Sequence, residues 1–106
     1  MQFETDISSP QAELFLAART LLIELHGLDE IKKPRITTYA HHSGNICHMR
    51  TMPHGIDFGF LKGAKMKDKL GLLKGNGKAM RVLPMSEINA DSIAYYIDQA
   101  IELNGG

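Results

Sequence analysis

The chain has 106 residues, and its 12 acidic and 12 basic side chains leave it without net charge. A chain of this length forms one domain that buries roughly 60 to 70 per cent of the surface its unfolded state exposes. The single cysteine, Cys47, excludes an intramolecular disulfide bond, and no stretch has the pattern of a membrane span or a signal peptide. We therefore expect one cytoplasmic domain, residues 1–106, that has no membrane partner.

Charge is distributed unevenly along this neutral chain. Residues 1–30 carry a net charge of −5, residues 31–81 carry +9, and residues 82–106 carry −4. Two interpretations are open: acidic helices neutralise a basic middle within one compact domain, or the middle presents a basic surface to an anionic partner. Charge order in the sequence does not decide between them, because it is not charge order in space.

The first predicted element is a helix that begins near Ser9 and ends at Gly27. Ser9 is a good N-cap residue, Pro10 suits the first helical position, and Gly27 suits the left-handed conformation that ends many helices. Apolar residues at helical spacing form one stripe between these ends: Leu14, Ala18, Leu21, Leu22 and Leu25. We expect this stripe to be buried against a sheet.

Three short strands are predicted next, over residues 36–40, 45–51 and 55–61. In the last of them Ile56 and Phe58 alternate with polar or small residues, which indicates one buried face.

The second and third of these strands are expected to form a hairpin. With Met49 opposite Ile56 and Cys47 opposite Phe58, the apolar sides coincide, and His48 lies beside Asp57 on the other face.

Residues 80–85 predict a fourth strand, and a second helix closes the chain. Asn89 is its N-cap, Asp91 suits the positive end of the helix dipole, and Asn104-Gly105-Gly106 ends it. Its buried stripe is Ile93, Ile97, Ala100 and Ile101. The predicted fold class is therefore α+β, with an antiparallel sheet of about four strands and the N- and C-terminal helices packed on one face.

The stretch "KGNGKAMR", residues 74–81, has the look of a phosphate-binding loop but matches neither standard motif. A Walker loop needs Ser or Thr after Gly-Lys, and Ala79 stands there; the position of its first glycine holds Leu72. A dinucleotide fingerprint needs a third glycine where Met80 stands.

Residues 59–83, "GFLKGAKMKDKLGLLKGNGKAMRVL", resemble the most recognisable stretch of the YdhG-like family of small bacterial domains of unknown function. The matching residues fall in two segments: Gly59, Phe60, Gly63 and Ala64, then Gly71, Leu72, Leu73, Gly75, Gly77, Lys78 and Arg81. The resemblance runs from about Pro34 to the end of the chain and implies an α+β fold with an antiparallel sheet. It implies no settled activity, although some members have been likened to frataxins, which are acidic iron-handling proteins.

The basic stretch supports a hypothesis of anion binding. Glycines let backbone N–H groups point together, and nearby cations add charge, so a phosphate-type ligand fits a site built from Lys74, Gly75, Gly77, Lys78 and Arg81. The competing interpretation makes Gly75-Asn76-Gly77 a turn between a short helix, residues 65–73, and the next strand.

A metal site is the alternative hypothesis. His48 and Asp57, joined by His42 or His54, carry groups that suit zinc or ferrous iron, yet their spacing matches no standard zinc motif. The frataxin comparison directs attention to acidic residues instead: Glu13, Glu24, Asp29 and Glu30. Cys47 is expected to be a small buried residue rather than a nucleophile.

No catalytic set is apparent, and Ser43 before Gly44 lacks a nucleophile-elbow motif. We expect a non-enzymatic binding or adaptor domain whose partner is an anionic small molecule, with a frataxin-like metal-handling protein as the alternative. Nucleic acid is not favoured, because the basic stretch lacks exposed aromatic residues. A homodimer or another protein partner stays open, and the sequence identifies no cofactor.

Overall fold

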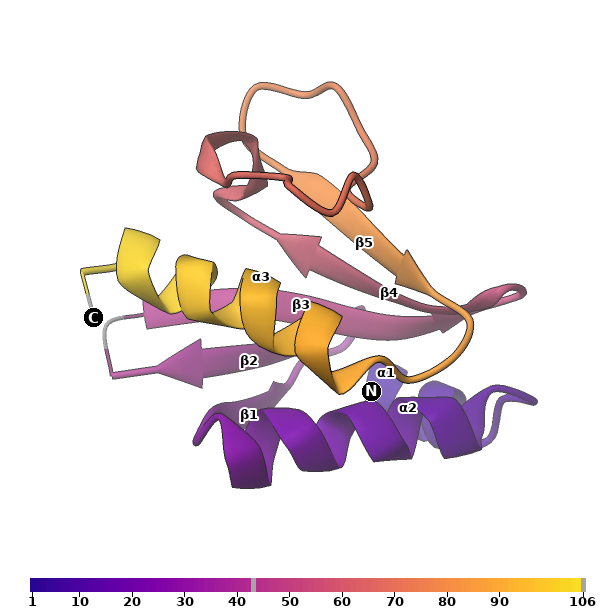
Figure 1. Cartoon of the computed structure of the whole chain (residues 1–106). Helices are drawn as coiled ribbons and strands as arrows, with labels where there is room; N and C mark the ends of the chain where they lie inside the picture. Colours follow the sequence, from indigo (N-terminus) through magenta and orange to yellow (C-terminus); the bar gives the residue numbers. More distant parts are fainter. Residues whose placement is uncertain (43, 106) are drawn as a thin grey trace.

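The computed structural model describes residues 1–42 and 44–105, in which helices cover one face of an antiparallel sheet (Figure 1). The strands lie in chain order across the sheet: β1 (Asp29–Lys32), β2 (Thr37–His41), β3 (Gly44–Met52), β4 (Gly55–Phe60) and β5 (Arg81–Met85). The predicted α+β class is confirmed, but the sheet has five strands rather than four. Ser43 and Gly106, which the sequence analysis considered, lie outside the described residues.

Strand β1 is the strand that the sequence analysis missed, because its alternation is the reverse of the usual one. Glu30 and Lys32 pair with Tyr39 and Thr37, so they face the helices, while Ile31 is 40% exposed on the other side. Arg19 of the preceding helix pairs with the Glu30 carboxylate, and Tyr39 donates a 2.9 Å hydrogen bond to it. A charge on the buried face is tolerated here because it is paired.

The N-terminal region holds two helices rather than one. Helix α1 (Gln2–Ile7) is connected to the sheet by the buried Asp6, which accepts hydrogen bonds from the backbone N–H and hydroxyl of Thr51. Helix α2 (Ala12–Thr20) begins two residues after the predicted first helical position, and the Ser9 hydroxyl accepts a hydrogen bond from the backbone N–H of Gln11 just before it.

Helix α2 continues into a π-helical turn, Leu21–Leu25. The backbone N–H of His26 bonds to the oxygen of Leu21, five residues back, so the turn is wider than an α-helical one. The predicted stripe is therefore broken: Leu22 is fully buried, whereas Leu25 is 63% exposed. Gly27 follows with φ of 66°, the left-handed conformation expected of it.

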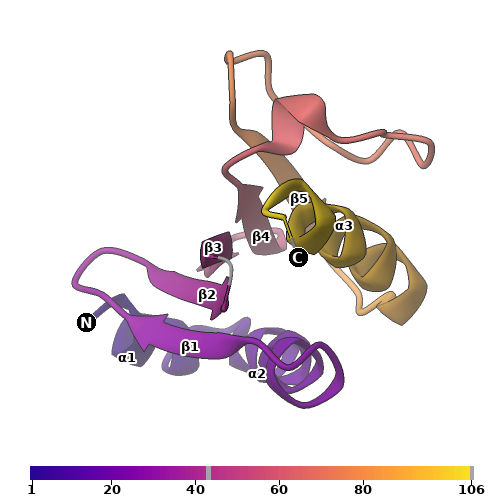
Figure 2. The same cartoon turned by 90° about the vertical axis from the view of Figure 1, so that its left-hand side faces the viewer.

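Helix α3 (Ala90–Leu103) begins where the sequence predicts. The side chain of Asn89 accepts a 3.0 Å hydrogen bond from the backbone N–H of Ser92, which confirms the predicted cap. Of the predicted stripe, Ile93, Ile97 and Ala100 are buried. In Figures 1 and 2, α2 and α3 lie on the same face of the twisted sheet.

The β3–β4 hairpin has the predicted faces but not the predicted register. Met49 pairs with Phe58 and Cys47 with Phe60, two residues from the expected partners. The turn consists of Pro53 and His54 alone, which sets this pairing. Because side chains alternate with a period of two, a shift of two residues leaves every side chain on its predicted face.

The core lies between this face and the helices, and Cys47 is fully buried within it. Its largest fully buried members come from β2, β3, β4 and β5 on one side and from the helices on the other: Tyr39, Met49, Ile56, Phe58, Phe60, Leu83, Phe15, Leu22, Ile93, Tyr96 and Ile97. The opposite side of the sheet is covered by no described helix. We call it the open face; His48, Asp57, Gly59 and Val82 lie on it.

Candidate functional site

The basic segment, residues 62–81, joins β4 to β5 at the upper end of the molecule in Figure 1. The predicted helix over residues 65–73 is wrong: a 3-10 turn, Gly63–Lys65, is followed by extended and turn structure. Asp68 replaces helical hydrogen bonds here, since its carboxylate accepts from the Tyr96 hydroxyl of α3 and from the backbone N–H of Leu72. These contacts hold the segment against α3.

The segment ends in the glycine loop, residues 74–81, which is closed at its base. Lys74 and Val82 exchange two backbone hydrogen bonds, of 2.7 and 2.9 Å. The backbone N–H of Ala64 donates a third, of 2.8 Å, to the oxygen of Ala79. The loop is thereby attached both to strand β5 and to the 3-10 turn.

Arg81 turns inward and holds the loop together. Its Nη1 donates hydrogen bonds to the backbone oxygens of Gly77 at 2.6 Å and of Met80 at 2.7 Å. Arg81 is one of the five residues predicted to bind an anion. Its hydrogen bonds to the loop backbone indicate that it positions the loop.

The backbone N–H groups of the loop are left free by this arrangement. In the part of the chain that the structure describes, the N–H groups of residues 75–80 donate to no other group of the protein. The side chains of Lys74 and Lys78 are exposed beside them. Hydrogen bonds occupy the carbonyls of Gly77, Ala79 and Met80, while the N–H donors and the two cations are free, which is a polarity that suits an anion.

The two glycines at the centre of the loop differ in what the fold demands of them. Gly75 has φ of 116°, a conformation that side chains rarely adopt. Gly77 has no positive φ, and a Cβ built on it would meet nothing within 4 Å. The fold therefore explains Gly75 and gives no steric reason for Gly77.

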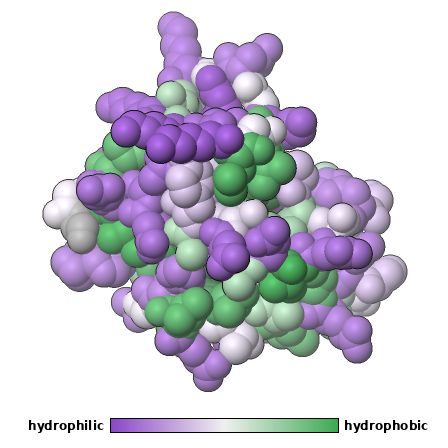
Figure 3. Space-filling model, in the orientation of Figure 1, coloured by the Kyte–Doolittle hydropathy of each residue, from purple (hydrophilic) through white to green (hydrophobic). Residues whose placement is uncertain are grey.

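The surroundings of the loop are strongly basic. The lysines of the basic segment are all exposed: Lys62, Lys65, Lys67, Lys69, Lys74 and Lys78. The segment's one acid, Asp68, has its pKa lowered by the hydrogen bond from Tyr96 and by backbone N–H groups. In Figure 3 the upper part of the molecule, where this segment lies, is mostly hydrophilic.

The predicted metal ligands His48 and Asp57 share the open face but do not lie opposite each other. His48 pairs with Gly59, and Asp57 pairs with Arg50, so the two are diagonal neighbours rather than partners. Asp57 Oδ1 lies 2.8 Å from His54 Nε2, while Nδ1 of His48 lies 3.0 Å from the Thr38 hydroxyl. Among the described residues, no three His, Cys, Asp or Glu side chains are placed to hold one metal ion.

The acidic residues suggested by the frataxin comparison do not form a cluster. Glu30 is committed to Arg19 and Tyr39; burial alone would raise its pKa, and the hydrogen bonds from these two residues outweigh it and lower the pKa. Glu13 and Glu24 lie eleven residues apart, on α2 and on the π-helical turn, and both are exposed.

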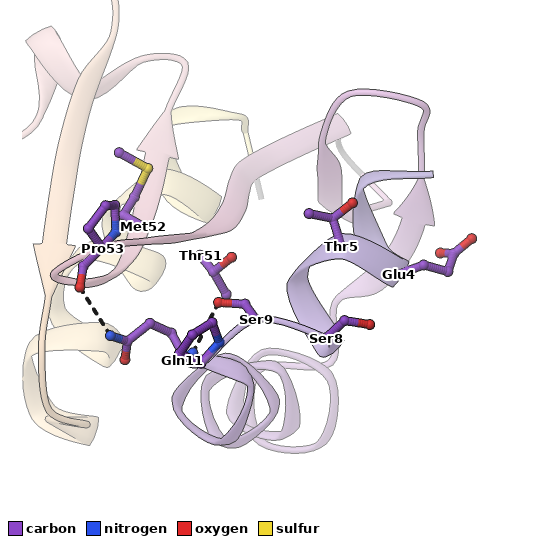
Figure 4. Close-up of a pocket in the computed structure, with 9 residues that line it drawn as sticks. Glu4, Thr5, Ser8, Ser9, Gln11, Thr51, Met52 and Pro53 are labelled. Atoms are coloured by element: carbon purple, nitrogen blue, oxygen red, sulfur yellow. Dashed lines mark hydrogen bonds between the residues drawn. The ribbon is translucent and has the colours of Figure 1, made fainter.

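A depression of the surface, of about 830 Å³, lies between the α1–α2 connection and the β3–β4 turn (Figure 4). The amide of Gln11 donates to the backbone oxygen of Pro53 across it, and the backbone N–H of Gln11 donates to Ser9. The side chain of Glu4 points away from this centre. The polar groups at its centre are bonded to one another, so the depression offers few free groups to a ligand.

A smaller groove, of about 310 Å³, lies on the open face. Its lining comes from the β1–β2 loop, strands β3 to β5 and the end of the glycine loop: Ile36, His48, Met49, Arg50, Asp57, Gly59, Met80 and Val82. His48 and Asp57 were predicted to lie on this face, whereas Ile36 and Met80 were not named as site residues. Each is the first residue of a predicted strand, residues 36–40 and 80–85, and alternation with Thr38 and Val82 is the signal that could have placed them here.

No family model, curated protein or solved structure matches this chain. No helix in residues 1–42 or 44–105 has the length and apolar character needed to cross a membrane.

Proposed function

We propose that this chain is a small, non-enzymatic binding domain of the YdhG-like type whose glycine loop binds a phosphate-type anion. The observation that carries the proposal is the polarity of the loop. Arg81 satisfies the carbonyls of Gly77 and Met80, and the N–H groups of residues 75–80 have no partner among the described residues. Backbone N–H groups that point together form anion-binding concavities in many proteins.

Gly77 supports this proposal independently of the charge. A residue whose Cβ would meet open space and whose φ is not positive has no need to be glycine for the fold. It does need to be glycine where a ligand approaches the backbone closely, because a side chain would occupy the space of the ligand. A turn alone accounts for Gly75 but not for Gly77.

The lysines supply attraction at longer range. Lys74 and Lys78 are exposed, and Asp68, the one acid of the basic segment, is bonded to Tyr96. Attraction between exposed charges is screened by salt, with a Debye length of about 10 Å at 0.1 M ionic strength. We therefore expect affinity to fall as salt rises. The proposed setting is the cytoplasm, as the lone cysteine suggests.

The test is a titration of the ¹⁵N-labelled protein with inorganic phosphate at low ionic strength, followed by amide chemical shifts. We expect shifts at residues 75–80 and a tenfold or greater loss of affinity in Gly77→Ala and in Lys78→Ala. Lys69→Ala is the matched control, because it removes an exposed lysine of the same segment outside the loop.

The proposal fails if phosphate leaves the amides of residues 75–80 unshifted. It also fails if Gly77→Ala and Lys78→Ala bind phosphate as well as Lys69→Ala does, since the shifts would then report a diffuse attraction to lysines.

A further inference from the structure

The glycine loop and the groove on the open face meet at Met80. Met80 belongs to the loop and also lines the groove. Its Cε lies 3.2 Å from the position that a Cβ on Gly59 would take, and the Cβ of His48 lies 3.8 Å from the same position. The missing side chain of Gly59 therefore lets the Met80 side chain lie over the sheet beside His48.

The groove is lined by both apolar and polar side chains. Ile36 and Met80 contribute apolar side chains from segments far apart in the sequence, and Val82 lies on the edge strand β5, where it pairs with Gly59. Met80 is 43% exposed, so its apolar surface is available to a ligand. Burial of such surface against a ligand stabilises a complex by about 25 cal/mol per Å².

The charged and titratable side chains of the groove differ in whether they already have a hydrogen-bond partner within the protein. Asp57 is bonded to His54, which occupies one of its oxygens. Nδ1 of His48 lies 3.0 Å from the Thr38 hydroxyl, and Nε2 has no partner among the described residues. Arg50 is exposed and its guanidinium contacts only the sulfur of Met52, at 3.4 Å, within the described part of the chain. The free groups are thus a cation and a ring nitrogen.

We propose that the groove holds the apolar body of the ligand whose anionic group the glycine loop binds, so that the ligand class is a phosphate monoester of a small, ring-sized apolar group. This inference rests on the proposed function and deepens it. The groove's volume of about 310 Å³ lies at the lower end of the range for small-molecule sites, roughly 300 to 1,000 Å³, and suits one ring rather than a peptide.

The test compares three probes on the full chain: inorganic phosphate, benzyl phosphate and benzyl alcohol. Burial of about 60 Å² of apolar surface corresponds to roughly tenfold in affinity, so benzyl phosphate is expected to bind at least tenfold more tightly than phosphate. Amides of His48 and Gly59 are expected to shift with benzyl phosphate and not with inorganic phosphate.

Met80→Ala shortens an exposed apolar side chain that lines the groove, and Leu70→Ala is its control. Leu70 is 47% exposed and belongs to the same basic segment, but it does not line the groove. We expect Met80→Ala to remove most of the advantage of benzyl phosphate over phosphate, measured as the ratio of the two affinities in the same variant. Leu70→Ala is expected to change neither affinity.

Equal affinities for phosphate and benzyl phosphate, or shifts confined to residues 75–80, would overturn this inference and leave the proposed function intact. The same holds if Met80→Ala behaves as Leu70→Ala. Benzyl alcohol that binds as tightly as benzyl phosphate would overturn it as well, because the anionic group would then contribute nothing. A loop that binds no phosphate at all would instead defeat the proposed function.

Discussion

Gly63 and Arg81 are in such close contact that a Cβ on Gly63 would lie 2.5 Å from the Cβ of Arg81 and 2.7 Å from its backbone nitrogen. Real Cβ atoms do not approach other atoms so closely. Two residues far apart in the sequence are therefore parts of one contact, in which the 3-10 turn packs against the last residue of the glycine loop.

Because Gly63 is crowded and Gly77 is not, we expect substitution of these two glycines by alanine to affect stability differently. Gly63→Ala must displace the backbone at Arg81, and we expect it to lower the free energy of unfolding by about 1 to 3 kcal/mol. Gly77→Ala places its Cβ in open space, and we expect a change within about 0.5 kcal/mol. Urea denaturation of both variants measures the difference. Equal destabilisation by the two substitutions would contradict the difference in crowding between Gly63 and Gly77.

Arg81→Lys tests the positioning role of the guanidinium. A lysine keeps the charge but cannot present the planar fork that bonds to Gly77 and Met80, so each bond lost costs about 1 kcal/mol. We expect faster amide hydrogen exchange at residues 75–80 and weaker phosphate binding despite the unchanged charge.

Arg35→Lys is the control for this variant, because Arg35 is an exposed arginine between β1 and β2. If Arg81→Lys and Arg35→Lys show the same amide hydrogen exchange at residues 75–80 and the same affinity for phosphate, the hydrogen bonds of Arg81 contribute nothing to the loop beyond its charge.

Glu30 predicts a dependence of stability on pH. Its folded pKa is lowered from an ordinary value of 4.5, so its stabilising effect is complete above that value and is lost as pH falls through the folded pKa. The free energy of unfolding of the wild type should therefore fall more steeply on acidification below about pH 5 than that of Glu30→Gln. At neutral pH we expect Glu30→Gln to cost about 1 to 3 kcal/mol, as for hydrogen bonds to charged groups.

Glu13→Gln separates this effect from general acid sensitivity. Glu13 is exposed on α2, so this variant should match the wild type at every pH. Parallel pH profiles for the wild type and Glu30→Gln would contradict the assignment.

Cys47 is expected to be unreactive in the native protein. The residue is fully buried, and burial raises the pKa of its thiol, so little thiolate forms and reagents have no access. We expect no labelling by a thiol reagent such as Ellman's reagent without denaturant and one thiol per chain in guanidinium. Ser8→Cys, with one added thiol at an exposed position, should label once under native conditions. Rapid native labelling of the wild type would show that the sheet opens at β3.

Much of the architecture is readable from the sequence, because local signals carry it. The alternation of Ile56, Phe58 and their neighbours identified a strand and its buried face, and the cap at Asn89 placed the start of α3. Both signals act over a few residues, so no tertiary contact is needed to interpret them. The glycines and lysines of the loop likewise marked a candidate site.

The tertiary structure decided what depends on residues distant in the chain. Strand β1 pairs with β2 and places Glu30 within reach of Arg19 and Tyr39, and neither contact is visible in the reversed alternation of "DEIK". The inward turn of Arg81 and the meeting of Met80 with Gly59 likewise follow from the approach of the loop to β4. Local patterns specify which face of an element is apolar, whereas burial of a charge and the shape of a groove are set by partners that only folding brings together.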